Sequence, residues 1–137
     1  MSINQPLNWV LWILRLAAAV IMLQTLFFKF TGSEESVYIF STLGMEPWGR
    51  IGTGVFELIA SVLLLWPRTT AFGALLGMGL MGGALFFHVA KLGIEVKGDG
   101  GLLFIYALIV FISCGVLLFV FQSQIKQVLV KFISNQK

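Results

Sequence analysis

The stretch GTGVFELIASVLLLW (residues 52–66) carries a single carboxylate, Glu57, in an otherwise apolar or small-residue segment. A segment of this length and hydropathy is typical of a helix that spans a membrane. The whole chain agrees, since 58% of its 137 residues are hydrophobic, only 11% are charged, and the mean hydropathy is +0.97. We therefore expect an integral membrane protein in which Glu57 requires a partner inside the fold.

Four segments of this kind follow one another along the chain. They cover residues 8–29, 48–66, 70–91 and 101–121, and each is close to the roughly 20 residues that a helix needs to cross the hydrocarbon core of a bilayer. The connecting loops are short compared with the spans, so neighbouring helices are expected to run antiparallel. The sequence predicts an all-α fold, a membrane four-helix bundle of up-down topology, with one transmembrane domain over residues 1–137.

The tail QSQIKQVLVKFISNQK (residues 122–137) has a different pattern. One helical face carries five large apolar residues with two lysines on its flanks: Ile125, Val128, Leu129, Phe132 and Ile133, flanked by Lys126 and Lys131. Such a helix is typical of segments that lie along a membrane surface. A frayed extension of the fourth span fits equally well, so both interpretations stay open.

The basic residues of the loops indicate an orientation. The end that holds both termini carries Arg68, Lys126, Lys131 and Lys137 without any acid, whereas the opposite loops mix basic and acidic residues. Lys and Arg are enriched on the cytoplasmic side of membrane proteins. We expect a protein of a bacterial cytoplasmic membrane with both termini in the cytoplasm.

Arg15 in the first span is the expected partner of Glu57. At a rise of about 1.5 Å per residue, Arg15 would lie about 10 Å above the inner end of its span and Glu57 about 13 Å above the inner end of the second. A charge at the centre of a spanning helix costs roughly 2.5 to 3.5 kcal/mol, which favours pairing inside the bundle. The sequence therefore predicts an Arg15–Glu57 ion pair between the first two spans.

Small and polar residues extend the stripes that hold these two charges. The third span carries two glycine pairs at a four-residue spacing, Gly73 with Gly77 and Gly79 with Gly83, and this spacing lets membrane helices approach closely. We interpret the glycines as packing positions, with a ligand slot between the helices as the alternative. The stripes that share a face with Arg15, with Glu57 and on the third span are predicted to point inward: Ala18, Ala19, Met22, Leu26 and Lys29; Arg50, Thr53, Gly54, Ala60 and Ser61; and Thr70, Ala74, Gly77, Met81, Ala84 and His88.

A second polar layer is expected at the outer end of the bundle. Lys29 ends the first span, His88 lies near the end of the third, and the loop KLGIEVKGDGG (residues 91–101) adds Asp99. Lys and His at a membrane interface commonly act as anchors whose polar tips reach the head groups. The alternative is that Lys29 and His88 hydrogen-bond a polar head group or the carbonyl of a quinone.

Other kinds of site find little support. With one His and one Cys, the chain cannot form an intrachain zinc cluster or a bis-histidine haem site by itself, and no metal is expected. Cys114 fits a small buried hydrophobe. The basic residues are too scattered for a nucleic-acid surface, so no nucleic-acid partner is expected.

Three long motifs resemble DoxX and DoxX-like membrane proteins. They are LRLAAAVIMLQTLFFKFTG (residues 14–32), FSTLGMEPWGRIGTGVFELIASVLLLWPRTTAFGALL (residues 40–76) and ALFFHVAKLGIEVKGDGGLLF (residues 84–104). The resemblance implies a four-helix membrane fold that associates with a quinone or a redox partner. It assigns family positions to Arg15, Lys29, Glu57, His88 and Asp99.

Two hypotheses of function follow. In the first, the chain is a redox-associated membrane subunit that binds a quinone-like or other lipophilic small molecule in the bundle interior. In the second, it is a non-catalytic scaffold, anchor or small carrier, and the Arg–Glu pair only fixes helix packing. The expected partners are the lipid bilayer and either further redox subunits or a second copy of the chain. The sequence shows no catalytic residue and no cofactor motif, and a quinone is the one cofactor that the first hypothesis involves. The residues expected to bind a ligand or exchange protons are Arg15, Lys29, Glu57, Ser61 and His88, with Asp99 in the outer loop.

Overall fold

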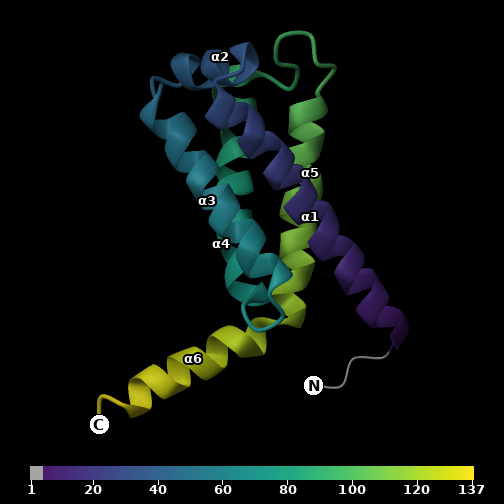
Figure 1. The fold of residues 1–137 in the computed structure, drawn as a ribbon, viewed down its shortest axis with the longest axis vertical. Helices are drawn as coiled ribbons and strands as arrows, with labels where there is room; N and C mark the ends of the chain where they lie inside the picture. Colours follow the sequence, from purple (N-terminus) through teal and green to yellow (C-terminus); the bar gives the residue numbers. More distant parts are fainter. Residues whose placement is uncertain (1–4) are drawn as a thin grey trace.

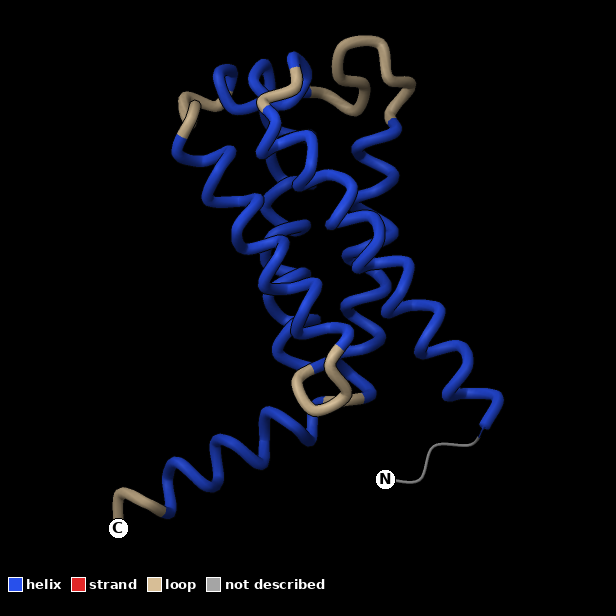
Figure 2. Tube along the Cα trace, viewed as in Figure 1, coloured by secondary structure: helices blue, strands red, loops and turns tan. Residues whose placement is uncertain are grey.

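The computed structural model describes residues 5–137, and every regular element in this part of the chain is helical (Figure 2). The elements follow one another as α1 (Gln5–Thr31), α2 (Glu34–Thr42), α3 (Trp48–Leu65), α4 (Thr70–Phe87), the π-helical turn η1 (His88–Leu92), α5 (Leu102–Val120) and α6 (Gln122–Ser134).

Four of the helices are long and apolar enough to cross a membrane. The candidate spans are Leu7–Thr31, Trp48–Leu65, Thr70–Leu92 and Leu102–Val120, which confirms the predicted membrane bundle. Helix α1 packs against α3 and α5, and α4 packs against the same two helices on the other side. The four helices thus form a closed ring with α2 lying across one end (Figure 1). We call this end the α2 end, and the opposite end, where α6 leaves the bundle, the α6 end.

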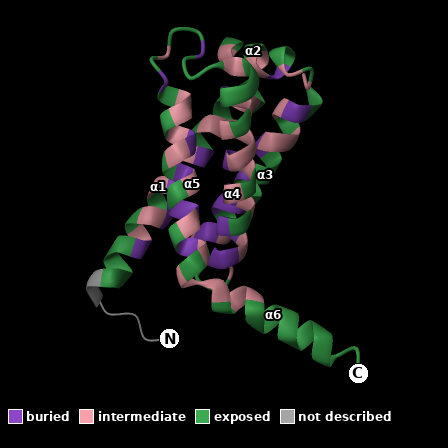
Figure 3. Cartoon of the chain, turned by 180° about the vertical axis from the view of Figure 1, so that it is seen from behind, coloured by how far each residue is buried: buried purple, intermediate pink, exposed green. Residues whose placement is uncertain are grey.

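Apolar and polar residues are distributed as a lipid environment requires. Large apolar side chains cover the outside of the four long helices, whereas the buried positions concentrate along the centre of the bundle (Figure 3). Many of these buried residues are small or polar, because van der Waals contact and interhelical hydrogen bonds hold helices together in lipid. Most of the predicted interior stripes are buried: Ala18, Ala19, Met22, Gly54, Ala60, Ser61, Thr70, Ala74, Gly77, Met81 and His88. The other members are only half-buried: Leu26, Lys29, Arg50, Thr53 and Ala84.

Helices α3 and α4 are in closest contact near the α6 end. A Cβ atom at Gly73 would lie 2.5 Å from the backbone nitrogen of Leu64 and 2.8 Å from the carbonyl oxygen of Ala60. A Cβ atom at Gly77 would lie 2.8 Å from Sγ of Cys114 on α5. The predicted packing role is therefore confirmed for the first glycine pair.

The second glycine pair does not pack against another helix of this chain. A Cβ atom at Gly79 or Gly83 would have no neighbouring atom within 4 Å. The expectation that this pair also brings helices together is wrong for contacts within the part of the chain that the structure describes. Helix α4 is thus closely packed at the α6 end and open at the α2 end.

Helix α2 was not predicted, because its nine residues are too few and too polar to give a membrane signal. Its first turn nevertheless carries a cap, since the backbone N–H of Ser36 donates to the hydroxyl of Ser33 at 3.3 Å. Glu34 and Glu35 in that turn suit the positive end of the helix dipole. Ser, Glu and Glu at residues 33–35 were therefore a usable sequence signal.

Helix α6 is a separate element that leaves the bundle at an angle to α5 (Figure 1), so the interpretation as an extension of the fourth span is wrong. The side chain of Gln124 fixes its first turn, because its amide donates to the carbonyl of Pro67 at 2.8 Å and its oxygen accepts from the N–H of Ala71 at 2.9 Å. The apolar face of α6 remains exposed, including Val128, Leu129, Phe132 and Ile133. A position along the membrane surface stays a prediction for this helix.

The glycine contacts predict opposite responses to the same substitution on α4. We expect Gly73→Ala to destabilise the protein by roughly 1 to 3 kcal/mol, because the new methyl group must push the α3 backbone away. The matched control, Gly79→Ala, should leave stability unchanged or raise it slightly, since Ala is the better helix former. Thermal unfolding of the detergent-purified proteins measures both, and equal losses would contradict the packing described here.

Candidate functional site

The buried carboxylate of Glu57 is paired with Lys29. The ammonium nitrogen of Lys29 lies 3.0 Å from Oε1 of Glu57, and the hydroxyl of Thr25 donates to the same oxygen at 3.4 Å. Glu57 is only 1% exposed, and its second oxygen, Oε2, has no hydrogen-bond partner. The pair joins α1 to α3 well inside the fold.

The predicted Arg15–Glu57 pair is wrong. The guanidinium of Arg15 lies between the rings of Trp12 and Phe121, at 4.4 and 4.7 Å from their centroids. Arg15 precedes Lys29 by 14 positions, which is about 21 Å of helix. Helix α1 is described from Gln5 and extends past the bundle at the α6 end (Figure 1), so Arg15 lies level with the end of α5 and far from Glu57.

Arg50 fixes the end of α1 and with it the position of Lys29. Its guanidinium donates to the backbone carbonyl of Lys29 and forms an ion pair with Glu46 at 2.8 Å. A cation at the last carbonyls of a helix satisfies acceptors that have no partner within the helix and suits the negative end of the helix dipole. The contact therefore ties the end of α1 to the start of α3.

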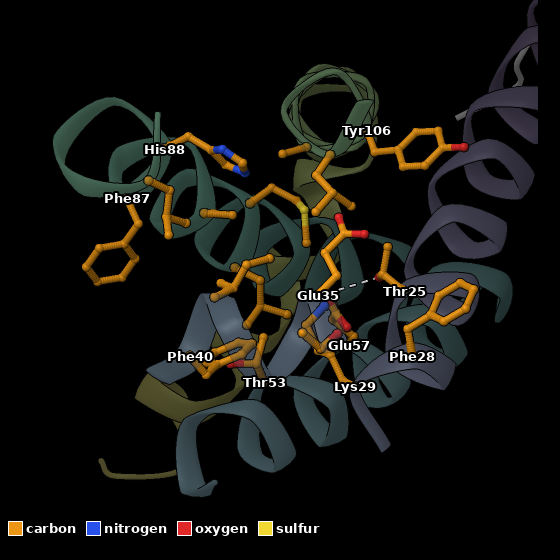
Figure 4. Close-up of a pocket in the computed structure, with 18 of the residues that line it drawn as sticks. Thr25, Phe28, Lys29, Glu35, Phe40, Thr53, Glu57, Phe87, His88 and Tyr106 are labelled. Carbon is orange, nitrogen blue, oxygen red and sulfur yellow. Dashed lines mark hydrogen bonds and ion pairs between the residues drawn. The ribbon is translucent and has the colours of Figure 1, made fainter. Parts of the chain in front are cut away.

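A cavity of about 620 Å³ lies beside the Lys29–Glu57 pair at the α2 end. All four long helices and α2 contribute to its walls, which are mostly apolar (Figure 4). Polar residues line it from five elements and from the connections before α2 and before α5: Gln24, Thr25, Lys29, Ser33, Glu35, Ser36, Thr53, Glu57, His88, Asp99 and Tyr106.

Helix α2 supplies a second carboxylate to this cavity. The side chain of Glu35 points into the space between the helices (Figure 4). Burial raises the pKa of Glu35, the negative charge of Asp99 raises it further, and Lys97 acts in the opposite direction. Glu35 was missed as a site residue because the sequence places it in a loop, and its position follows only from α2.

His88 is held in one orientation at the end of α4. Its Nδ1 lies 2.9 Å from the carbonyl oxygen of Gly93, and its ring packs edge-on against Phe104. Because a carbonyl oxygen can only accept, Nδ1 carries the hydrogen, and Nε2 of the neutral ring is left as an acceptor. Gly93 adopts a φ of +82°, which glycine adopts readily. The π-helical turn η1 thus fixes both the place and the tautomer of this histidine.

Asp99 organises the loop that closes the cavity. Its carboxylate accepts from the backbone N–H groups of Val96, Gly101 and Leu103 at 3.0, 2.8 and 3.2 Å. Burial acts to raise the pKa of Asp99, but the three N–H donors and the nearby His88 outweigh it, so the pKa lies below its usual range. Asp99 therefore acts mainly as a structural cap at the start of α5.

The structure divides the predicted site residues into two groups. Lys29, Glu57, His88 and Asp99 all line the cavity, whereas Arg15 and Ser61 do not. The hydroxyl of Ser61 instead donates to the carbonyl of Glu57 one turn earlier, at 2.8 Å. Thr25, Glu35 and Tyr106 are cavity residues that the sequence did not single out; Thr25 lies one turn before Lys29, which was a usable signal. Within residues 5–137, no three His, Cys, Asp or Glu side chains are grouped so that they could hold a metal ion.

A family comparison covers the segments that build this cavity. The sequence model described as "DoxX-like family" matches residues 13–116, about three quarters of the chain. This chain belongs to the DoxX-like family. All charged residues of the cavity lie inside the matched segment of this DoxX-like protein, and α6 lies outside it. Comparisons with curated proteins and with solved structures found no match.

The burial of the Lys29–Glu57 pair predicts unequal effects of removing its two partners. Lys29→Met leaves the enclosed carboxylate of Glu57 without its cation, which should cost roughly 3 to 5 kcal/mol of stability. Glu57→Gln should cost less, about 1 to 2 kcal/mol, because the Lys29 side chain is 15% exposed and can turn toward water. Unfolding temperatures of the purified variants measure this difference. A larger loss for Glu57→Gln would contradict the arrangement.

The hydrogen bonds of Asp99 predict a stability that depends on pH at the acidic end. The pKa of Asp99 is lower in the folded protein than the value of about 3.9 in an unfolded chain. Ionised Asp99 therefore adds its full contribution to the free energy of unfolding above about pH 3.9, and this contribution is lost as the pH falls through the pKa of the folded protein. Unfolding temperatures measured from pH 6 to pH 3 should therefore decline more steeply for the wild type than for Asp99→Asn. Parallel curves would show that Asp99 makes no such contribution.

Proposed function

We propose that this DoxX-like protein binds a lipophilic small molecule with a quinone-like head group in the cavity beside Lys29 and Glu57, and that it serves as the membrane subunit of a redox system. The observation that supports the proposal is a buried charge pair in the wall of a largely apolar cavity. Structural packing alone does not require an open space next to such a pair.

The size and lining of the cavity suit such a ligand. Its volume of about 620 Å³ lies within the range of roughly 300 to 1,000 Å³ that is usual for small-molecule sites. Phe28, Phe40 and Leu80 provide apolar surface for a ring and a tail. The ammonium of Lys29 has three N–H donors, of which one is directed to Glu57, so donors remain for a carbonyl or hydroxyl oxygen of the head group.

The open part of α4 gives the ligand a route from the bilayer. Gly79 and Gly83 line the cavity, and no atom lies within 4 Å of the place where their side chains would begin. Gly79 is also exposed on the outer surface of the bundle. Because the outer surface of a membrane helix faces acyl chains, a ligand would pass between the lipid phase and the cavity beside these two glycines.

The proposed role assigns binding to this chain and electron exchange to a partner. Lys29 would hold an oxygen of the head group, and His88 and Glu35 would be available to exchange protons with it. A separate redox subunit would supply or remove the electrons.

A scaffold role is the competing proposal. It is favoured by the Lys29–Glu57 pair and the Arg50 contact, because together they join α1 to α3 without any ligand. The two proposals differ in the effect of a larger side chain introduced into the cavity. A scaffold should keep its function with such a side chain, whereas a binding protein should no longer bind its ligand.

Binding of decylubiquinone, a quinone with a short tail, tests the proposal. Isothermal titration of the protein in lipid nanodiscs should show binding by the wild type, at least tenfold weaker binding by Gly83→Leu, and weakening by roughly ten- to hundredfold for Lys29→Met, since a hydrogen bond to a charged group is worth about 1.5 to 3 kcal/mol. The controls are Gly52→Leu, which adds the same side chain at an open position of α3 outside the cavity, and Lys91→Met, which removes an exposed lysine.

The controls should bind as the wild type does. No binding by the wild type, or equal losses in the variants and their controls, would favour the scaffold. Analysis of small molecules extracted from the purified protein provides a second test, because a bound quinone should be retained by the wild type and absent from Gly83→Leu.

A further inference from the structure

Arg15 is a buried cation that the cavity does not use. Arg15 is 3% exposed, and its Nε and Nη1 atoms are enclosed without a hydrogen-bond partner among the residues that the structure describes. Trp12 and Phe121 cover the two faces of the guanidinium at 4.4 and 4.7 Å. Stacking satisfies the faces of the ion but leaves its N–H groups, which lie in the plane, without acceptors. An unpaired ion inside a membrane protein is costly and marks a functional site.

The chain has no carboxylate that could neutralise Arg15. Glu57 is paired with Lys29, and the other acids, Glu34, Glu35, Glu46, Glu95 and Asp99, all lie in α2, in the connections at the α2 end, or directly beside them. Residues 1–4, which the structure does not describe, contain no acid. The α6 end carries five cations: Arg15, Arg68, Lys126, Lys131 and Lys137. The counter-ion must therefore come from outside the chain.

A cleft of about 360 Å³ lies near the N-terminal end of α1 and is lined by Asn8, Trp9 and Trp12. Its link to Arg15 is Trp12, which lines the cleft and also covers one face of the guanidinium. Trp side chains of this kind are enriched at the level of lipid head groups. Trp9 is largely exposed on the outer surface of α1, which places the cleft against lipid.

We propose that Arg15 binds a phosphate group carried by a membrane lipid, in the leaflet that faces the α6 end. Of the guanidinium nitrogens, Nη2 is not among the enclosed atoms, so it can donate a charge-assisted hydrogen bond to a phosphate oxygen. Asn8 offers an amide to the same head group, and Lys126 and Lys131 on α6 add positive charge at this end. Because Phe121 connects α5 to α6, the bound lipid sits at the joint from which α6 leaves the bundle. Free phosphate offers the same chemistry, but the exposed Trp9 and the position on the outside of α1 favour a lipid.

Thermal unfolding in a neutral maltoside detergent tests the site. Dioleoyl phosphatidylglycerol should raise the unfolding temperature of the wild type by about 3 °C or more. Dioleoylglycerol, which has the same chains and no phosphate, should not. Arg15→Met should lose most of the shift, and Arg68→Met, which removes an exposed arginine at the same end, should keep it. Without added lipid, Arg15→Met should be at least as stable as the wild type, because it no longer encloses an unpaired charge.

Several results would overturn the proposal. An equal shift with dioleoylglycerol would show that the phosphate is not recognised. An equal shift with inorganic phosphate at the same concentration would assign the site to a free anion and exclude the lipid. Should Arg15→Met fail to fold, native mass spectrometry of the wild type decides, because the proposal requires phosphatidylglycerol to be retained in preference to dioleoylglycerol.

Discussion

A carboxylate inside a bilayer has to be neutralised by a neighbouring helix, and the Lys29–Glu57 pair does this here. The acid lies within α3, whereas the cation is attached near the end of α1 and reaches the acid through its flexible stem. Lysine suits this role because its long apolar chain can run along the helix while the charge lies elsewhere. Once the pair is formed, the register of α1 against α3 is fixed, and Arg50 reinforces it at the last turn of α1. The cavity lies beside these contacts, and Lys29 and Glu57 both line it.

Helix α4 shows how one residue type can produce two different structures. Gly73 and Gly77 allow close contact because atoms of α3 and α5 occupy the space where side chains would be. Gly79 and Gly83 lie two to ten residues further along the same helix, about half a turn to three turns, on another face of it, and there the space is left empty. Close helix contact is thus found at the α6 end, whereas the cavity lies at the α2 end. The polar residues that line the cavity lie at the α2 end, whereas Arg15, Ser61 and Thr70 are buried outside it.

Hydropathy was sufficient to predict the four spans, because the energy of a lipid environment dominates over local propensity in segments of that length. Helical spacing likewise predicted which faces of α1, α3 and α4 are buried. The pairing of charges was predicted incorrectly, because an estimate of depth depends on where a helix begins, and α1 extends beyond the level at which the other spans end. The role of Glu35 could not be predicted without α2, whose fold depends on contacts with the bundle. Arg15 was correctly expected inside the protein, but its aromatic partner Phe121 lies 106 positions away in the sequence, and no local pattern reveals such a contact.

Helix α2 and the glycines of α4 bound the cavity on two different sides. Helix α2 lies across one end of the bundle and lines the cavity there (Figure 1), whereas Gly79 and Gly83 line it from α4 without neighbouring side chains. A ligand that enters past these glycines, as proposed above, would exchange with a pool dissolved in the membrane rather than in the surrounding buffer. The occupancy of the cavity would then depend on the mole fraction of the ligand among the lipids. Adding ligand-free vesicles would lower this occupancy, even if the concentration of the ligand in water were held constant.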